Sequence, residues 1–338
     1  MQLNFNNLEI NNLCPQTEFE KKVFFFLKEW WSDSETVKVQ TSGSTGIPKI
    51  FDIEKRKMIS SAEMTCDFLG LKEENTALIC LPVEYISGKM MVVRSVARKL
   101  KLIIAEPSVS PLKQLTEKID FCAMTPLQVE NSLDRLYLIE NLIIGGAAVS
   151  ESLKKMIAEK GLPQDNRIFE TYGMSETLSH IGLKQIFPQA EDYFTVFDSV
   201  EISEDERGCL KIYAPNLNDE VLHTNDLVEV INEKQFRFLG RIDHVINSGG
   251  AKIFPEQLEA LVKKKIPNEA VFLGQEDDTL GQKIILIVEG TESQDIIKKI
   301  SEIQFEKNFH RPKDIIFIEK IPRTPNGKIS RIELKKMI

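Results

Sequence analysis

The feature that most limits the possible folds of this chain is an alternation, between residues 17 and about 175, of helical stretches with short apolar runs. Thr17 with Glu20 has the pattern of a capping box, Ser150 stands where another helix cap is expected, and Ser110-Pro111 and Thr125-Pro126 mark two more helix starts. The apolar runs lie at 77–81, 102–105, 119–124, 142–144 and 168–170, and most have no polar face. Such strands are typical of a parallel sheet covered by helices, so we expect an α/β fold.

After about Thr177 the pattern changes to short strands separated by turns, expected at 194–197, 209–214, 228–231 and 235–239. From Gly240 onward a further pattern predicts helices at 255–265 and 293–308 and strands at 270–273, 284–288 and 315–318. We therefore expect a large N-terminal α/β domain with a β-rich subdomain at residues 1–240, and a small α+β C-terminal domain at residues 241–338.

Charge and cysteine usage exclude several classes of protein. The formal net charge of -8 argues against a nucleic-acid or anionic-membrane surface, which would need a basic excess. No apolar run approaches the roughly 20 residues needed to span a bilayer. The five cysteines include no C-x-x-C pair and the four histidines have no metal-ligand spacing, so neither a disulfide framework nor a zinc site is indicated. We expect a cytoplasmic protein that binds neither nucleic acid nor membrane.

One segment, Thr41-Ser42-Gly43-Ser44-Thr45-Gly46-Ile47-Pro48-Lys49, contains four hydroxyls, two glycines and a lysine. It can hold a phosphate, because glycines let backbone N–H groups converge on an anion and lysine adds charge. It is not a Walker loop, since Pro48 stands where that motif needs glycine and Ile50 replaces its magnesium-binding hydroxyl residue. The strand-like residues after Pro48 predict a loop between two strands. A polar surface turn is the alternative.

Six segments, taken in order, resemble those of the acyl-adenylate-forming (AMP-binding) superfamily, which includes acyl-CoA synthetases, adenylation domains and luciferases. They are the loop 41–49, the run 142–147, Tyr172-Gly173-Met174-Ser175-Glu176, His223-Thr224-Asn225-Asp226, Gly240-Arg241-Ile242-Asp243 with the following Ser248-Gly249-Gly250, and Pro322-Arg323-Thr324-Pro325-Asn326-Gly327-Lys328. Any one of these is a weak signal, whereas six in the family's order are a strong one. The resemblance covers roughly residues 37–331.

The resemblance implies that the chain binds ATP. Tyr172 would flank the adenine, Ser175 would meet phosphate, and Asp226 would accept hydrogen bonds from both ribose hydroxyls. Asn225 replaces the family's glycine beside Asp226, which asparagine can tolerate if the position needs φ > 0. The full set of implied ATP-binding residues is Thr41, Ser42, Gly43, Ser44, Thr45, Gly46, Lys49, Gly146, Tyr172, Gly173, Ser175, Asp226 and Arg241.

Three residues are implied to act in the reaction itself. Glu176 would hold Mg²⁺, Lys328 would reach the carboxylate and the α-phosphate, and Asp243 would be the hinge of a mobile C-terminal domain. A carboxylate and a triphosphate repel each other, so cations placed where charge develops suit this chemistry. In the implied reaction a carboxylic acid attacks the α-phosphate of Mg-ATP to give acyl-AMP and pyrophosphate, and the thiol of coenzyme A then displaces AMP.

Within the superfamily, the segments 41–46, 81–88 and 123–128 resemble most closely those of the o-succinylbenzoate–CoA ligases of menaquinone biosynthesis. The acid would then be a dicarboxylate, in which one carboxylate reacts and the other needs an anchor. Lys89, Arg94 and His180 are the candidates for that anchor. The full set of implied substrate-binding residues is Tyr85, Ser87, Lys89, Arg94, Gly145 and His180.

Three alternatives stay open at this point: a ligase for another aryl or short acyl acid, an adenylation enzyme that loads a carrier-protein thiol, and a nucleotide-binding regulator without catalysis. A homodimer is a further expectation. Relatives usually carry a longer region before the phosphate loop, and dimerisation could cover surface that its absence exposes.

Overall fold

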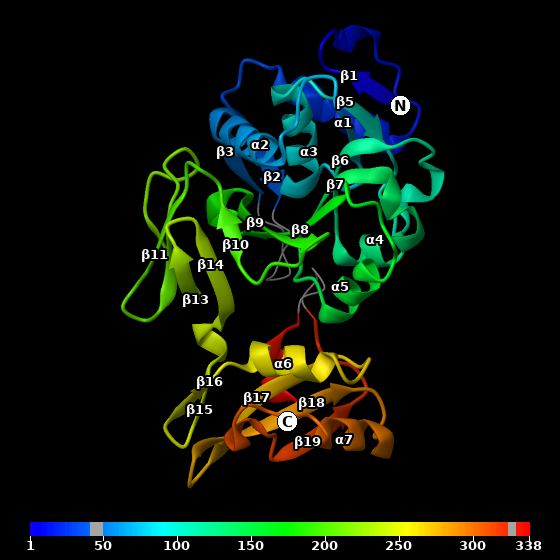
Figure 1. Cartoon of the computed structure of the whole chain (residues 1–338). Coiled ribbons are helices and arrows are strands. Elements are labelled where there is room, and N and C mark those ends of the chain that lie inside the picture. The colour runs from blue at the N-terminus through cyan, green and yellow to red at the C-terminus, as the bar shows by residue number, and fades with distance from the viewer. Residues whose placement is uncertain (41–49, 324–328) are drawn as a thin grey trace.

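The computed structural model describes residues 1–40, 50–323 and 329–338, which form a larger body and a smaller one (Figure 1). The predicted phosphate loop, residues 41–49, and Lys328 lie outside the described residues. The loop is flanked by β2 (Thr36–Gln40) and β3 (Ile50–Glu54), which pair antiparallel. The prediction that this segment joins two strands is therefore confirmed.

Five parallel strands form the centre of the larger body: β4 (Thr76–Ile79), β5 (Lys101–Ile104), β6 (Ile119–Met124), β7 (Ile139–Ile144) and β8 (Arg167–Gly173). Each overlaps a predicted apolar run, so the α/β prediction is confirmed. Successive side chains point to opposite faces of the sheet, which places Phe121 and Ala123 in one core and Cys122 and Met124 in another.

Helices cover both faces of this sheet (Figure 1). On one face lie α1 (Glu18–Trp30), α2 (Lys55–Leu69) and α3 (Ile86–Ala97), and on the other lie α4 (Pro126–Glu130) and α5 (Glu151–Ala158). The predicted capping box at Thr17 is present, and the predicted cap at Thr125 also forms one, whereas Ser110 precedes only a 3-10 turn, Pro111–Gln114. Among the described helices, none is long and apolar enough to cross a membrane.

The predicted β-rich region continues the same hydrogen-bonded sheet. Its strands are antiparallel: β9 (His180–Phe187), β10 (Phe194–Val196), β11 (Glu201–Glu204), β12 (Cys209–Tyr213), β13 (Leu222–Asn232) and β14 (Gln235–Arg241). The sheet order is β1-β5-β4-β6-β7-β8-β9-β10-β14-β13-β12-β11, with β1 (Gln2–Asn4) at one edge. Pairing changes from parallel to antiparallel between β8 and β9.

The smaller body is an α+β unit with its own cores. Its elements are β15 (Ile246–Ser248), β16 (Ala251–Ile253), α6 (Pro255–Lys263), β17 (Ala270–Asp277), β18 (Gly281–Glu289), α7 (Gln294–Ser301), β19 (Asp314–Ile318) and α8 (Arg331–Lys336). The strands form one sheet, with β19 parallel to β18. The predicted helix 293–308 ends early, at Ser301.

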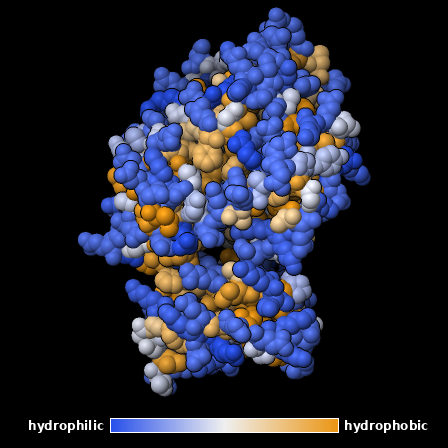
Figure 2. All heavy atoms as spheres, in the orientation of Figure 1, coloured by the Kyte–Doolittle hydropathy of each residue, from blue (hydrophilic) through white to orange (hydrophobic). Residues whose placement is uncertain are grey.

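The two bodies meet through α6. A Cβ added to Gly240, in β14, would lie 2.7 Å from Oε2 of Glu256 in α6. Just beyond α6, Nζ of Lys264 lies 4.0 Å from Oε2 of Glu151 in α5. Figure 2 shows a hollow between the two bodies. The domain boundary at residue 240 and the mobility of the smaller body stay predictions.

Candidate active site

Several predicted site residues lie at the carboxyl ends of neighbouring strands. Gly145 and Gly146 follow β7, and Tyr172 and Gly173 end β8. A Cβ on Gly145 would lie 2.7 Å from a side-chain oxygen of β8, and Gly146 has φ +86°, a conformation that favours glycine. Ligands of open α/β sheets bind beyond the carboxyl ends of the strands, so this edge is the candidate site.

Gly173 joins the two parts of this site. It pairs with His180 across β8 and β9, and a Cβ on it would lie 2.4 Å from His180 Cα and 2.4 Å from Ser179 O. These separations are too short for real atoms, so glycine is required here. The segment with Tyr172 is thereby fixed against the segment with His180.

The first part is a cluster of the buried Thr65, Arg94 and His180 with the half-buried Ser179, which we call the Arg94 cluster. Arg94 is 2% exposed, and its Nη2 donates to Ser179 Oγ at 3.2 Å. Thr65 Oγ1 lies 3.0 Å from His180 Nε2, and Ser179 Oγ lies 3.4 Å from His180 Nδ1. The cluster joins α2, α3 and the start of β9, three segments far apart in sequence.

No carboxylate among the described residues neutralises the positive charge of the Arg94 cluster. Within the described residues Arg94 has no carboxylate partner, and its buried Nε has no hydrogen-bond acceptor. Burial lowers the pKa of Arg94 to about 10. Burial and the nearby Arg94 cation hold the pKa of His180 well below its usual range, so the imidazole is neutral at pH 7. A buried guanidinium without an anion is costly, and a bound anion would offset that cost.

The other predicted substrate residues lie elsewhere. Lys89, on the same helix as Arg94, is buried, and its Nζ lies 4.2 Å from the centre of the Phe26 ring of α1. Burial lowers the pKa of Lys89. Ser87 and Tyr85 are exposed at the start of α3. Tyr85 also forms a parallel bridge with Gln40, the last residue of β2, which puts the end of β2 beside this helix.

The second part of the site surrounds Asp226, which is 8% exposed. The Tyr172 hydroxyl donates to Asp226 Oδ2 at 2.5 Å, and Arg241 Nη1 lies 3.2 Å from Asp226 Oδ1. Burial and the Asp226 carboxylate raise the pKa of Tyr172, so its hydroxyl stays protonated and donates. The Tyr172 ring packs on the rings of Phe194 and Phe236, with centroids 5.5 and 4.9 Å away.

A chain of polar contacts continues from Asp226 to the predicted hinge. Arg241 Nη2 also bonds Asp243 Oδ2 at 2.9 Å, and Asn225 Nδ2 lies 3.2 Å from Asp243 Oδ1. Arg207 Nη1 donates to Asn225 Oδ1 at 3.1 Å. We call this set, from Tyr172 to Arg207, the aspartate network. Asn225 lies in β13 and does not have a positive φ, so the exchange of glycine for asparagine strains no backbone here.

The site is suited to magnesium that arrives with a nucleotide. Ser175 and Glu176 are exposed in a short 3-10 helix, Ser175–Thr177, and the described residues give the Glu176 carboxylate no ion pair. The Glu176 carbonyl accepts from Asn218 Nδ2 at 3.2 Å, which ties this turn to the β12–β13 connection. The described residues form no group of three or more metal-ligand side chains. Mg²⁺ commonly binds one or two carboxylates plus substrate phosphates and water, so one free carboxylate fits.

The segment that carries Lys328 is flanked by described contacts. Arg323 and Ile329 form an antiparallel bridge on either side of the undescribed residues. Arg331 Nη2 bonds both carboxylate oxygens of Glu259 in α6, at 2.8 and 2.7 Å. The residue that follows this segment closely, Arg331, therefore contacts α6, the helix that meets the larger body.

Sequence inspection missed Thr65, Ser179 and Arg207. Ser179 directly precedes a predicted site histidine and could have been included on that basis. Thr65 lies 115 residues from its partner His180, and Arg207 lies 18 residues from Asn225. Neither of these two belongs to a recognisable motif, so only the fold reveals them.

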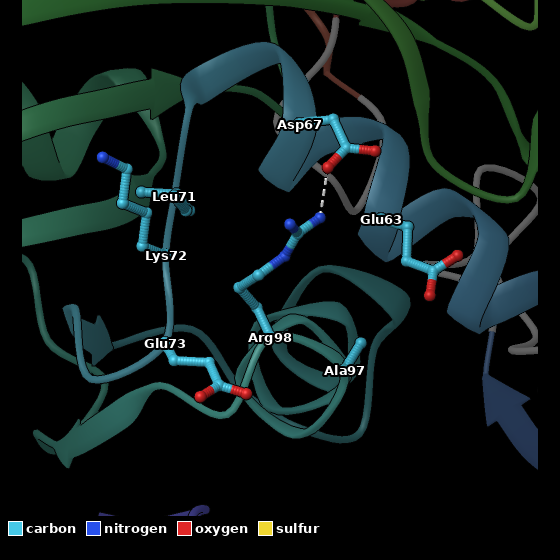
Figure 3. Close-up of a pocket in the computed structure, with 7 residues that line it drawn as sticks. All are labelled: Glu63, Asp67, Leu71, Lys72, Glu73, Ala97 and Arg98. Carbon is cyan, nitrogen blue, oxygen red and sulfur yellow. Dashed lines mark hydrogen bonds and ion pairs between the residues drawn. The ribbon is translucent and has the colours of Figure 1, made fainter.

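A separate surface hollow of about 530 Å³ lies near the carboxyl ends of α2 and α3 (Figure 3). Arg98, one helical turn beyond Arg94, pairs there with Asp67, and Glu63, Lys72 and Glu73 also line it. Its other charged side chains are exposed, and Arg98, which is half-buried, has a carboxylate partner. Arg98 is therefore a natural control for the buried Arg94.

Comparisons with known proteins agree with this arrangement. The AMP-binding enzyme family matches residues 29–200, about half of the chain. A 2-succinylbenzoate–CoA ligase of Listeria monocytogenes is 26% identical over 346 residues, covering 92% of this chain and 72% of the relative. The corresponding ligase of Lactococcus lactis is 25% identical and covers 98% and 76%.

Solved structures of acyl-CoA synthetases are also similar to this chain. An acyl-CoA synthetase (AMP-forming)/AMP-acid ligase II-like protein from Dyadobacter fermentans is 30% identical, with a TM-score of 0.68 and coverage of 100% of this chain and 99% of that one. An o-succinylbenzoate coenzyme A synthetase from Bacillus subtilis, in complex with ATP and magnesium ion, is 22% identical, with a TM-score of 0.72 and coverage of 88% and 69%.

AMP-forming ligases use ATP, Mg²⁺ and coenzyme A, as the sequence predicts for this chain. The matched relatives are ligases, so the alternative of a regulator without catalysis has no support. The chain belongs to the AMP-binding enzyme family and is an AMP-forming acid–CoA ligase.

Proposed function

We propose that the acid is a dicarboxylate, o-succinylbenzoate, and that the product serves menaquinone biosynthesis. The names of the similar ligases of L. monocytogenes and L. lactis support this substrate. The observation that carries the proposal is Arg94, a buried cation without an anion in the described part of the chain. A monocarboxylate needs no second anchor, whereas a dicarboxylate leaves one carboxylate charged after activation.

In this proposal the carboxylate that does not react binds Arg94 Nε and Nη2. The geometry favours Arg94 over the other two anchor candidates. Lys89 Nζ lies over the Phe26 ring, and His180 is held neutral by burial and by Arg94. Ser179 and Thr65 would orient the ring of His180 against the bound acid.

The first half-reaction joins the acid to AMP. A carboxylate oxygen bonds to the α-phosphorus of ATP, and the bond from that phosphorus to pyrophosphate breaks. Asp226 would accept hydrogen bonds from the ribose, Tyr172 would flank the adenine, and Arg241 would contact the nucleotide. Magnesium, held by Glu176 and the phosphates, would neutralise charge as the pyrophosphate leaves. Lys328 and residues 41–49 lie outside the described residues, and their roles stay as the sequence predicts them.

The second half-reaction transfers the acyl group. The thiol of coenzyme A loses its proton, its sulfur bonds to the acyl carbon, and AMP leaves. A hollow of about 280 Å³ in the smaller body supports coenzyme A as the acceptor. Its lining includes Ser248 and Gly249, and Phe309, Arg311 and Lys313 supply an exposed ring and two cations. The ring can stack on the adenine of coenzyme A, and the two cations can pair with its phosphates. The phosphopantetheine arm of a carrier protein has no adenine and fewer phosphates.

A panel of acids in an ATP–pyrophosphate exchange assay tests the proposal. We expect o-succinylbenzoate to give the highest exchange rate, and its analogue without the anchored carboxylate to be poorer by roughly 10- to 100-fold, the usual value of one or two charge-assisted hydrogen bonds. Equal rates for the two compounds would reject the dicarboxylate. A higher rate with a simple aryl or short acyl acid would favour that alternative ligase.

The acceptor is tested separately with supplied acyl-AMP. If coenzyme A is the acceptor, Arg311→Gln should raise its KM about 10-fold through loss of a phosphate contact. Lys298→Gln, an exposed lysine of α7 outside the hollow, is the matched control. Faster transfer to a phosphopantetheinylated carrier protein than to coenzyme A would support the carrier-loading alternative. Cytoplasmic location and a homodimer also remain predictions, and light scattering of the purified protein tests the dimer.

A further inference from the structure

The side chain of Asn225 lies between Arg207 and Asp243. Its Oδ1 accepts from Arg207 Nη1 at 3.1 Å, and its Nδ2 lies 3.2 and 3.3 Å from the two carboxylate oxygens of Asp243. Arg207 is held in turn by the Thr224 carbonyl, at 2.9 Å, and by Asp205, at 2.7 Å. The contacts therefore join the β11–β12 turn and β13 to Asp243, just after β14, where the chain leaves for the smaller body.

The amide of Asn225 suits this connection because it offers both an acceptor and a donor. Arginine can only donate hydrogen bonds and an ionised carboxylate can only accept them, so a side chain between the two must do both. The family's glycine has no side chain to contribute. Aspartate would face Asp243 with a like charge, and alanine would reach neither neighbour.

The same contacts link the hinge to the nucleotide position. Arg241 bonds both Asp226 and Asp243, so the two carboxylates share one guanidinium. The hydrogen bond from Arg241, the bond from Asn225 and the Arg241 charge hold the pKa of Asp243 below its usual range, and Asp243 stays ionised. Movement of Asp243 thus breaks contacts on both sides of it.

We propose that Asn225 is a positioning residue that latches the hinge at Asp243, through Arg207, and so sets the balance between the two half-reactions. The latch rests on the two-step reaction proposed above and on the predicted hinge, because the smaller body must turn about Asp243 between the steps. The contacts of Asn225 with Arg207 and Asp243 stabilise the hinge in the conformation described here and raise the barrier to its rotation. The family's glycine lacks this restraint.

Amide hydrogen exchange of residues 241–248, read by mass spectrometry on the protein without substrates, tests the latch directly. Asn225→Gly should speed exchange in this segment about 2- to 5-fold, as expected for loss of partly exposed hydrogen bonds to a charged group. Asn225→Asp should speed it further, because two carboxylates would then face each other. Asn232→Gly, at the end of β13 just before the turn to β14, is the matched control and should leave the segment unchanged.

The half-reactions give the second measurement. The ratio of the adenylation rate to the rate of thioester formation from supplied acyl-AMP should change about 2- to 5-fold in Asn225→Gly. It should change further in the same direction in Asn225→Asp. Arg207→Gln should have a similar effect, and in the double variant Arg207→Gln with Asn225→Gly the two effects should not add, since they remove one connection.

Unchanged exchange in Asn225→Gly, with the protein folded, would overturn the latch. Equal slowing of both half-reactions with an unchanged ratio would also overturn it, because a merely structural role predicts that result. Since hydrogen exchange needs no substrate, faster exchange without any adenylation of the acid panel would support the latch and reject the proposed function.

Discussion

The Arg94 cluster and the aspartate network lie on either side of Gly173 but are built in opposite ways. The Arg94 cluster is buried, and its one charge has no opposite charge among the described residues. In the aspartate network, Asp226 and Asp243 share Arg241, and every carboxylate has a donor. A buried charge without a partner favours ligand binding because the ligand supplies the missing charge. A network that is already paired must exchange partners when its ligand arrives, which suits a site that opens and closes.

The largest expected effect comes from Gly173, where the two regions touch. Gly173→Ala should force the strand away from His180, because the added Cβ would lie 2.4 Å from backbone atoms. We expect kcat/KM to fall by at least about 100-fold for both ATP and the acid, since a small displacement of reacting groups costs about that much. Steady-state kinetics with each substrate varied in turn measure this.

Gly70→Ala is the comparison for that experiment. Gly70 has φ +69° and no atom within 4 Å of an added Cβ, so the variant should lose only about 1 kcal/mol of stability from backbone strain. If Gly173→Ala kept the kinetics for either substrate, the two regions would not be coupled through this contact.

The next effect isolates the Arg94 cluster. Arg94→Met should lower kcat/KM for the dicarboxylate by roughly 10- to 100-fold, through loss of charge-assisted hydrogen bonds, and should leave the KM for ATP unchanged. The melting temperature should hold or rise, because the buried guanidinium costs desolvation energy in the free enzyme. Exchange kinetics and a thermal melt measure both quantities.

Arg98→Met serves as the control on the same helix, since Arg98 is paired with Asp67 at the surface. Equal losses for the dicarboxylate and its monocarboxylate analogue in Arg94→Met would mean that Arg94 does not bind the second carboxylate.

A smaller effect isolates the aspartate network. Asp226→Asn should raise the KM for ATP about 10-fold, because a neutral amide is a weaker acceptor for the ribose hydroxyls than a carboxylate. The KM for the acid should stay within about twofold, since the Arg94 cluster is untouched. The exposed Asp192→Asn is the control. A larger change in the KM for the acid than for ATP would reverse the assignment of the two regions.

The smallest effect concerns pH. The pKa of His180 is lowered in the folded protein by burial and by Arg94, so the unfolded chain takes up a proton first as pH falls. The stability that neutral His180 provides is complete above the unfolded pKa near 6.5. It is lost at up to about 1.4 kcal/mol per pH unit as pH falls below that value.

Urea unfolding at pH 7.5, 6.5 and 5.5 measures this slope. His180→Asn should flatten it, because asparagine keeps a polar group near Thr65 without a titrating ring. The exposed His223→Asn should not change it. An identical slope in wild type and His180→Asn would place the titrating group elsewhere.

Much of the fold was predictable because local patterns and the larger structure agree. The capping boxes at Thr17 and Thr125 and the five apolar strands depend on neighbours in sequence and on burial, and both are visible in a string of residues. The predicted separation of a β-rich subdomain was less complete, because the pairing of β8 with β9 merges the two regions into one sheet. Whether two successive strands pair in one sheet is decided by the packing around them, and no local sequence pattern shows it.

The sequence by itself determined the α/β class, the strands on both sides of the predicted phosphate loop, the family, and the motifs that contain Tyr172, Asp226 and Arg241, whose roles stay predictions. These follow from periodicity and from short motifs, whose chemistry is local. Only the tertiary structure decided that Arg94 has no carboxylate partner among the described residues while Arg98 has one, and that Lys89 packs on Phe26. It also decided that Asn225 bridges Arg207 and Asp243. The physical reason is that burial and pairing depend on which distant segments the fold brings together.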